Sequence, residues 1–245
     1  MKTDWFKDWF ESDEYLKVYS HRNLEDAKKL TATLFKKIDL PDNALVLDAA
    51  CGNGRYSLLL SESGFRVVGF DLSKNLLLRA KENTSNNREN IFLFRADVRN
   101  LCFKVKFDLI LLAFTSFGYF ETDEENFKFT SAAFDFLKPG GYFVLDFFNP
   151  AYLEKHLVTY SEKNVSGLEI RERRKIENGK VIKTIEISGN GEVKKYEERV
   201  KLYSQNFIVN RMETIGYKIV DIFGNYEGNK FDGEKSERLI IIAQK

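Results

Sequence analysis

A glycine-rich segment flanked by acidic residues is the part of the sequence best suited to hold a small polar ligand. Asp48 ends a short apolar run and is followed by Gly52 and Gly54. The two glycines allow a sharp backbone turn and a close approach of the chain to a ligand. Asp71 and Asp97 each follow a later apolar run. If these runs are strands of one parallel sheet, the three carboxylates meet at the edge where such sheets bind ligands.

The chemistry of these groups separates two kinds of ligand. A dinucleotide-binding loop carries a third glycine, but that position is Ser57 here, and the Asp48 carboxylate would repel a pyrophosphate. A ligand with an ammonium and no phosphate fits better, and S-adenosylmethionine has an ammonium, a carboxylate and a sulfonium. Asp71 follows the glycines by about 20 residues, the spacing at which an acid bonds ribose hydroxyls. Asp97 could accept from an adenine amino group, with the Val98 backbone N–H serving a ring nitrogen.

The elements around these residues alternate between helical and strand patterns. Apolar residues at helical spacing predict helices, and short apolar runs bounded by turn residues predict buried strands. The predicted helices cover residues 24–38, 55–63, 74–84 and 123–137. The predicted strands cover residues 44–50, 66–70, 91–95, 107–114 and 142–148. Ser73 is the expected N-cap of the third helix, and 138–141 is expected to end the fourth. This alternation predicts an α/β fold, a doubly wound and mostly parallel sheet with helices on both faces.

The sequence changes character after Pro150. Charged and apolar residues alternate from Leu168 to Tyr203, and two Asn-Gly pairs, at 178–179 and 190–191, separate extended segments. Asn-Gly favours a tight hairpin turn because both positions need a positive φ. Three antiparallel strands are therefore predicted within an insertion, residues 151–203, that would act as a lid or a dimer contact. The core is predicted from residues 1–150, which begin with a helical flap, and 204–245, with a helix over 205–215 and strands over 217–225 and 237–245.

Composition narrows the classes of partner. The chain has 245 residues, a net charge of +1 and two cysteines. Nucleic acids are bound through many cationic contacts, so the near-neutral charge does not favour a nucleic-acid partner. No apolar run is long enough to cross a bilayer and the N-terminus lacks the pattern of a signal peptide, so no membrane partner is expected. The low cysteine content predicts a cytoplasmic protein, and a monomer or homodimer is expected. Two cysteines provide neither a disulfide framework nor a metal-ligand spacing, and no metal is expected.

The motifs resemble those of the class I, Rossmann-like S-adenosylmethionine-dependent methyltransferases. DAACGNGR is similar to their first motif, GFDLS to the second, RADVRNL to the third and FDLILLAFTSFGYF to the fourth. LKPGGYFVLDF is similar to the segment leading into their fifth strand, and SERLIIIAQK to part of their closing strand pair. The resemblance, which covers residues 44–150 well, implies S-adenosylmethionine as cofactor. The contacts that it implies come from Asp48, Gly52, Gly54, Asp71, Leu72, Asp97, Val98 and Ala113.

The segment after the fourth predicted strand bears on the methyl acceptor. Enzymes that methylate exocyclic amines of nucleobases, or amide nitrogens, often carry an Asn/Asp-Pro-Pro-aromatic motif there, whereas this chain reads Ala-Phe-Thr-Ser-Phe at 113–117. No Pro-Cys pair is present, which argues against methylation of cytosine C5. FTSFGYF resembles the corresponding segment of small-molecule N-methyltransferases, including those acting on amino sugars. The resemblance implies methyl transfer to a nitrogen or oxygen of a small molecule, and the lack of an obvious base favours an amine.

Four aromatic or basic residues are candidates for the acceptor side and for closure of the site. Tyr119, just beyond the fourth predicted strand, is expected near the transferable methyl group and would orient the nucleophile; its alternative role is packing within the loop. Tyr15 is a second catalytic candidate. Tyr15, Tyr19 and Arg22 would close over the cofactor, with Tyr19 or Arg22 near its carboxylate, or would belong to a helix packed on the domain surface.

Two other functions stay open on the sequence. One is methylation of RNA or protein, which uses the same cofactor chemistry on a larger acceptor. The other is non-catalytic binding of S-adenosylmethionine for regulation or assembly, because a fold does not by itself fix a function. Binding of the cofactor without turnover on a broad panel of acceptors would indicate the second.

Overall fold

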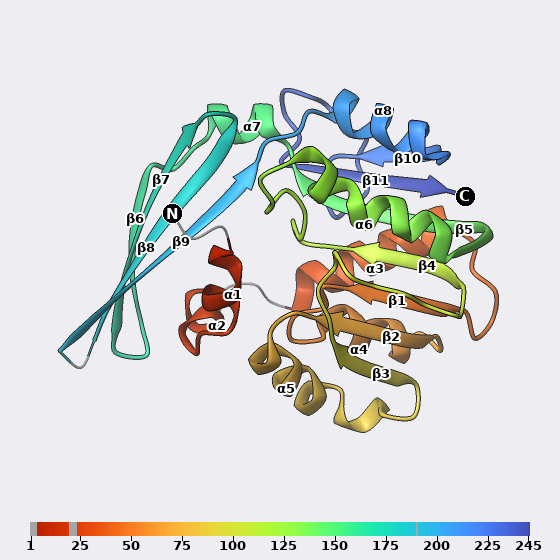
Figure 1. Ribbon diagram of the computed structural model, residues 1–245, viewed down its shortest axis with the longest axis horizontal. Helices are drawn as coiled ribbons and strands as arrows, with labels where there is room; N and C mark the ends of the chain where they lie inside the picture. The colour runs from red at the N-terminus through yellow and green to blue at the C-terminus, as the bar shows by residue number, and fades with distance from the viewer. Residues whose placement is uncertain (1–3, 20–23, 190) are drawn as a thin grey trace.

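The computed structural model describes residues 4–19, 24–189 and 191–245 and shows two sheets with a pair of short helices between them (Figure 1). The larger sheet has seven strands with helices on both faces, and the smaller sheet has four strands. The two short helices are α1 (Trp5–Phe10) and α2 (Glu14–Val18). They lie beside the carboxyl ends of the parallel strands (Figure 1), which is the edge where the ligand site is predicted.

The larger sheet has the predicted α/β organisation. Its spatial order is β10-β11-β5-β4-β1-β2-β3, so the chain starts in the middle and works outwards in both directions. Only β11 runs against its neighbours, β5 and β10, and the other pairs are parallel. The strands are β1 (Leu45–Ala49), β2 (Arg66–Asp71), β3 (Ile91–Arg95), β4 (Phe107–Leu112), β5 (Leu137–Phe148), β10 (Lys218–Phe223) and β11 (Arg238–Gln244).

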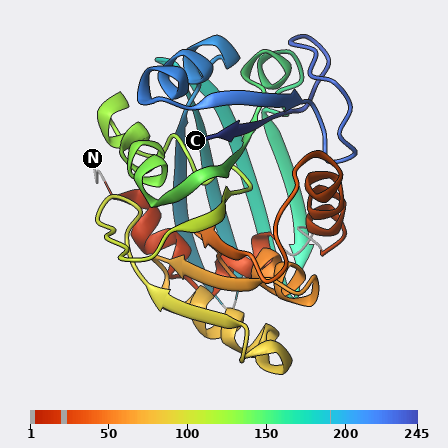
Figure 2. The same ribbon diagram turned by 90° about the vertical axis from the view of Figure 1, so that its right-hand side faces the viewer.

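Helices cover both faces of this sheet (Figure 2), because both faces of its central strands are apolar. Along β4, Leu109 and Leu111 pack with α3 (Leu24–Lys37) and α4 (Arg55–Glu62). The alternate residues Ile110 and Leu112 pack against the other side. That second side is covered by α6 (Asp123–Phe136) and α8 (Gln205–Ile215). Helix α5 (Lys74–Asn83), which is followed by the short η1 (Ser85–Asn87), packs near β2 and β3. As predicted, Ser73 caps α5, its hydroxyl accepting from the Leu76 N–H at 3.1 Å.

Two strand boundaries differ from the predictions for a local reason. The strand predicted over 107–114 ends at Leu112, because Phe114 and Thr115 adopt left-handed φ values of 59° and 64° that a strand does not contain. The segment 138–141 was predicted only to end a helix. Helix α6 does end just before it, at Phe136, but β5 already begins at Leu137 and runs through this segment with an irregular register against β4.

The smaller sheet is antiparallel, as predicted, but it has four strands rather than three. Its strands are β6 (Tyr160–Val165), β7 (Leu168–Glu177), β8 (Lys180–Gly189) and β9 (Glu192–Lys201), following α7 (Pro150–Lys155). Asn178 and Gly179 both have positive φ, 51° and 69°, as the first of the two predicted hairpin turns requires, and Asn190 of the second lies outside the described residues. The strand missed was β6, whose turn to β7 is a Ser166-Gly167 pair with φ of 51° and 77°.

The two N-terminal helices are held by an aromatic and ionic contact with the smaller sheet. The Trp9 ring is fully buried and lies 4.5 Å, between ring centroids, from Tyr196 of β9. Its indole N–H donates to the Glu198 carboxylate at 2.6 Å. Glu198 also accepts from the Tyr19 hydroxyl at 2.5 Å, and the Lys183 ammonium donates to the same hydroxyl at 2.7 Å. These contacts hold the N-terminal helices against the smaller sheet, and Figure 1 shows both helices beside the carboxyl edge of the larger one.

Candidate active site

A cavity lies at the carboxyl edge of the larger sheet, between that edge and the helices α1 and α2. Its walls come from the segments that follow β1, β2, β3 and β4 and from the two N-terminal helices. Of the twelve residues predicted for the site, ten line this cavity: Tyr15, Tyr19, Asp48, Gly52, Asp71, Leu72, Asp97, Val98, Ala113 and Tyr119. Gly54 does not line it, and Arg22 lies outside the described residues.

The glycine-rich segment turns back sharply between β1 and α4. Ala50, Gly52 and Gly54 have φ values of 53°, 56° and 78°, all left-handed. A Cβ atom at Gly52 would meet no atom within 4 Å, so this glycine presents bare backbone to open space. A Cβ atom at Gly54 would lie 3.0 Å from the Ala80 Cβ, so this glycine lets α5 approach the loop. The two glycines therefore have different tasks, and only Gly52 faces the cavity.

Asp71 is buried and connects the end of β2 to the glycine loop. One carboxylate oxygen accepts from the Gly52 N–H at 2.8 Å, and the other accepts from the Ser73 N–H at 2.9 Å. Burial raises the pKa of Asp71, against the lowering effect of these bonds. A carboxylate has about four acceptor positions, so Asp71 can still accept from a ribose hydroxyl, the role predicted for this residue.

Asp48 is fully enclosed behind the same loop. The Ser57 hydroxyl donates to its carboxylate at 2.6 Å, so the residue at the third-glycine position serves as a partner for this acid. Burial raises the pKa of Asp48 to about 7, and the nearby Asp71 charge adds to that effect, while the bond from Ser57 opposes it. A cationic group beside Asp48 would favour its ionised form.

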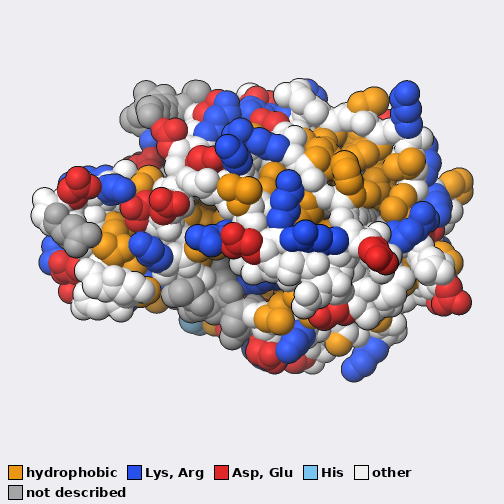
Figure 3. All heavy atoms as spheres, turned by 90° about the horizontal axis from the view of Figure 1, so that it is seen from below, with side chains coloured by type: hydrophobic (Ala, Val, Ile, Leu, Met, Phe, Trp, Pro, Cys, Tyr) orange, Lys and Arg blue, Asp and Glu red, His pale blue; other side chains and the backbone are white. Residues whose placement is uncertain are grey.

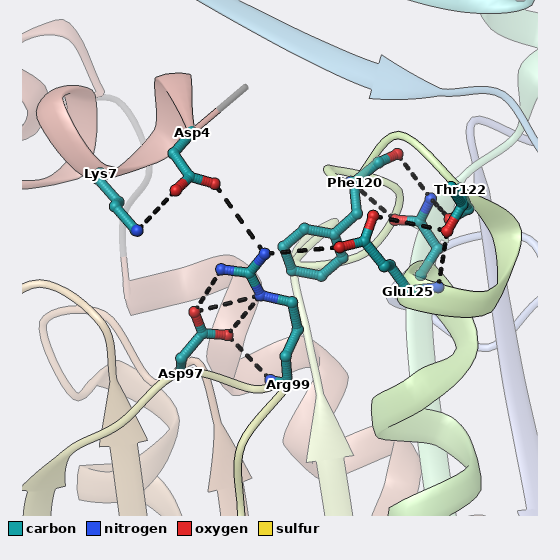
Figure 4. A network of polar contacts seen from close by, with 8 residues as sticks. Asp4, Lys7, Asp97, Arg99, Phe120, Thr122 and Glu125 are labelled. Carbon is teal, nitrogen blue, oxygen red and sulfur yellow. Dashed lines mark hydrogen bonds and ion pairs between the residues drawn. The ribbon is translucent and has the colours of Figure 1, made fainter. Parts of the chain in front are cut away.

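Asp97 is held by an arginine that was not predicted (Figure 4). The Arg99 guanidinium donates to both carboxylate oxygens of Asp97, at 2.7 Å in the shortest bond. Burial alone would raise the pKa of Asp97, but the bonds and charge of Arg99 hold it below its usual value. The guanidinium also lies 4.6 Å from the Phe120 ring centroid and 3.8 Å from the Glu125 carboxylate. Arg99 thereby connects the adenine-side candidate Asp97 to the loop before α6.

Aromatic residues make up much of the rest of the cavity lining. Tyr119 lies 5.3 Å from Trp5 and 5.8 Å from Phe10, measured between ring centroids. Tyr15 lies 5.0 Å from Phe10 and 5.0 Å from Tyr19. The hydroxyl of Tyr19, predicted near the cofactor carboxylate, instead bonds Glu198 and Lys183, while the residue still lines the cavity. Phe6 and Phe10 of α1 therefore form part of the cavity wall.

The charges around the cavity favour a ligand with a cationic centre. Among the described lining residues the ionisable acids are Asp48, Asp71 and Asp97, and the cation is Arg55. The Arg55 guanidinium lies 5.3 Å from the Phe114 ring centroid. Asp97 is already paired with Arg99, which leaves Asp48 and Asp71 against Arg55, and two acids suit the ammonium and sulfonium of S-adenosylmethionine better than the pyrophosphate of a dinucleotide.

Two more observations bear on whether S-adenosylmethionine can be accommodated beside these residues. The bare backbone at Gly52 leaves room beside the three acids. The Tyr56 hydroxyl, on a residue that lines the cavity, is buried without a hydrogen-bond partner in the described part of the chain. Buried polar groups in native proteins normally have a partner, so a ligand atom or a water would complete this one. In the same described ranges no cluster of metal-ligating side chains occurs, and no helix is long and apolar enough to cross a membrane.

Comparison of the sequence with known proteins points to one enzyme class. A family described as a methyltransferase domain matches residues 46–141. The putative methyltransferase YqeM of Bacillus subtilis (strain 168) is 33% identical over 115 residues, so the alignment spans 46% of this chain and 46% of that protein. The cypemycin N-terminal methyltransferase of a Streptomyces species is 23% identical over 209 residues, 83% of this chain and 84% of the relative.

Solved structures share the fold over nearly the whole chain. An S-adenosylmethionine-dependent methyltransferase from Clostridium acetobutylicum ATCC 824 superimposes with a TM-score of 0.79 at 21% identity, covering 94% of this chain and 95% of that one. CalS10, an amino pentose methyltransferase from Micromonospora echinaspora with S-adenosylmethionine bound, gives a TM-score of 0.67 at 17% identity, covering 95% and 97%. At these identities the likeness establishes the fold.

Proposed function

We propose that this chain, an S-adenosylmethionine-dependent methyltransferase by its domain and its relatives, transfers the methyl group to an amine nitrogen of a small molecule. The observation that carries the proposal is the composition of the cavity. Its lining combines three acids and a glycine loop with aromatic rings, including those of Tyr15 and Tyr119. The acids suit a cationic cofactor, and the rings suit an apolar acceptor.

The cofactor supplies an already activated methyl group, so the protein has mainly to bind, align and exclude water. In this proposal Asp71 bonds the ribose, and Asp97 with Val98 bonds the adenine. Gly52, Leu72 and Ala113 shape the cofactor side, and Arg22 neutralises the carboxylate. Tyr119 and Tyr15 orient the acceptor nitrogen. The rings around them keep water out of the acceptor end.

The lack of a histidine or lysine base in the described lining supports an amine over a hydroxyl, since Asp48, whose pKa burial raises to about 7, is enclosed behind the glycine loop and bonded by Ser57. Neither histidine nor lysine occurs among the described residues that line the cavity. A neutral amine can attack without a base, whereas a hydroxyl has to lose its proton during the reaction. Glycine, amino-sugar and peptide N-termini are amine acceptors named for similar proteins, which supports the same choice.

The charge distribution does not support an RNA acceptor. The net charge is +1. The face seen in Figure 3 has Lys and Arg side chains interspersed with Asp and Glu, without a continuous basic surface. Binding to a phosphate backbone depends on many cationic contacts. A small molecule or a short peptide therefore fits this protein better than a nucleic acid.

The proposal predicts selective binding of S-adenosylhomocysteine, followed by methylation of amines. At 100 times its Kd a ligand stabilises a protein by about 2.7 kcal/mol, so thermal unfolding should shift clearly with S-adenosylhomocysteine and little with NAD. Mass spectrometry of a panel of paired amines and alcohols, including amino sugars and short peptides, should show a gain of one methyl group on amines. A larger shift with NAD would refute the cofactor assignment. Binding without turnover on the panel would favour a non-catalytic function.

A pair of glycine variants provides the control. Gly52→Ala places a methyl group in the open space of the cavity and should abolish binding of S-adenosylhomocysteine. Gly64→Ala introduces a side chain at a similar left-handed φ, 89° against 56°, also with no atom within 4 Å, but away from the cavity. Both variants carry the same kind of backbone strain. Loss of binding in both would show that the Gly52 result reflects strain, not occupancy of the site.

A further inference from the structure

The loop after β4 adopts an unfavourable backbone conformation in the wall of the cavity. Phe114 and Thr115, two consecutive residues with Cβ atoms, have φ values of 59° and 64°. Such residues are uncommon in the left-handed region, and they persist only where the surroundings fix them. Residues 113–119 form this loop, and Ala113, Phe114 and 116–119 line the cavity, with Tyr119 among them. The contacts that fix the loop therefore shape the proposed acceptor end.

Asp146 of β5 binds the backbone of both strained residues. Its carboxylate accepts from the Phe114 N–H at 2.8 Å, and its own carbonyl accepts from the Thr115 N–H at 2.9 Å. The residue is fully buried and does not line the cavity. A buried carboxylate needs several donors, since leaving it without them is strongly unfavourable.

Arg238 of the neighbouring strand β11 supplies the opposite charge. Its guanidinium donates twice to one Asp146 oxygen, at 2.6 and 2.8 Å, and once to the Thr115 hydroxyl at 3.0 Å. The other Asp146 oxygen accepts from the Tyr226 hydroxyl at 3.2 Å. The guanidinium also lies 5.7 Å from the centroid of the Phe114 ring. One arginine thus contacts both the acid and the two strained residues.

We infer that Asp146 and Arg238 are positioning residues that hold the 113–119 loop in the conformation needed to align the acceptor, an inference that rests on the proposed function. Neither side chain lines the cavity, so both act through the loop. The backbone of Phe114 and Thr115 is fixed by Asp146, and the Thr115 side chain by Arg238. Tyr119 follows four residues later on the same loop. A displacement of about 1 Å at a reacting group can lower a rate on the order of 100-fold.

The test compares Asp146→Asn and Arg238→Lys with a control variant in a similar acid–base pair at the opposite end of β4. Asn removes the charge with little change in shape, and Lys lacks the planar fork that bonds two partners at once. The control is Asp108→Asn. Asp108 also accepts from a backbone N–H, that of Leu45 at 2.8 Å, and pairs with Lys138 at 2.8 Å, but it does not line the cavity or contact the loop.

Two readouts are expected to separate positioning from general stability. Amide hydrogen exchange over 113–119 should be at least about tenfold faster in Asp146→Asn and Arg238→Lys than in the wild type, and unchanged in Asp108→Asn. With the amine acceptor found in the panel, kcat should fall about 10- to 100-fold in the first two variants, while the Kd for S-adenosylhomocysteine stays within about threefold.

The inference is overturned if exchange over 113–119 is unchanged in both variants, or if Asp108→Asn accelerates it equally. It is also overturned if kcat and the Kd for S-adenosylhomocysteine change together. Tyr226→Phe removes one bond to Asp146 and keeps the ion pair, so it provides a milder variant if the others do not fold. Failure of the proposed function would appear as no methyl transfer by the wild type itself. The exchange measurement does not depend on an acceptor and would still decide the role of Asp146 and Arg238.

Discussion

At the scale of single residues, Tyr119 is the side chain whose hydroxyl and ring can be tested separately. Its ring packs against Trp5, Phe6 and Phe10 in the cavity wall. Tyr119→Phe keeps these ring contacts, so the thermal midpoint and the Kd for S-adenosylhomocysteine should change little. If the hydroxyl orients the acceptor, steady-state kinetics should show kcat reduced by about 10- to 100-fold.

Tyr196→Phe is the matched control for that measurement. Its ring lies on Trp9 and its hydroxyl donates to Glu14 at 3.2 Å, but it does not line the cavity. This variant should keep the wild-type kcat. An unchanged kcat in Tyr119→Phe would leave Tyr119 with a packing role only, the alternative that the sequence also allowed.

The functional role of single residues was predictable where a short stretch of sequence contains the signal for it. The acids Asp48, Asp71 and Asp97 lie at or just beyond the carboxyl ends of consecutive strands, so the parallel order of the sheet brings them together. Arg238 and Asp146 are separated by 92 residues in sequence and meet only through the pairing of β11 with β5, which no local pattern reveals. Arg99 lies only two positions after Asp97, and that short spacing was the signal available for it.

At the scale of elements, periodicity predicted the core helices and strands, and the errors fall where a local signal was weak. Strand β6 consists of partly or fully exposed residues, so it has no apolar face to mark it. Its Ser-Gly turn is a weaker hairpin signal than Asn-Gly. The start of β5 was misplaced because a Pro-Gly-Gly sequence usually interrupts a strand, yet here β4 and β11 pair with the rest of β5 on both sides.

The N-terminal helices depend on docking for their stability, which gives an element-scale prediction. Helix α1 has 6 residues and α2 has 5, too few for an isolated helix to be stable in water. Glu198 bonds Trp9 and Tyr19, so Glu198→Gln should weaken the docking. Hydrogen exchange over residues 4–19 should accelerate several-fold, with less change in the core of the larger sheet.

Glu192→Gln, at the exposed start of the same strand, is the control and should exchange like the wild type. If Glu198→Gln also exchanges like the wild type over residues 4–19, the aromatic contacts of Trp9 hold α1 and α2 without help from the carboxylate. The affinity for S-adenosylhomocysteine should then be unaffected by the variant as well.

At the scale of the whole molecule, two carboxyl groups with shifted pKa values change the free energy of unfolding over two different pH ranges. Glu172 of the smaller sheet is partly buried, which alone would raise its pKa, but the charges of Lys183 and Arg174 lower it to about 2. A carboxyl with a lowered pKa stabilises the fold above its unfolded value, near 4.5, and loses this contribution as the pH falls toward 2. Loss of the Glu172 contribution therefore destabilises the fold only at acidic pH.

Asp48 changes the free energy of unfolding in the opposite direction, over the next pH range. Its pKa is raised by burial from 3.8 to about 7, so between these values the folded chain binds a proton that the unfolded chain releases. Unfolding is then favoured as the pH rises from about 4 to 7, by at most about 1.4 kcal/mol per pH unit for one group. In the absence of cofactor, the free energy of unfolding from urea titrations at pH 5 and pH 7 should therefore fall across this range.

The Asp48→Asn variant should reduce that fall, because the amide oxygen can still accept from the Ser57 hydroxyl but carries no proton equilibrium, while Asp71, whose pKa is also raised by burial, keeps its own share. Asp108→Asn, at the other end of the sheet, leaves Asp48 intact and should show the same fall as the wild type. Equal slopes in the wild type and in Asp48→Asn would mean that the Asp48 carboxyl titrates near its ordinary value. The loop would then admit enough water to solvate the ionised acid even without a ligand.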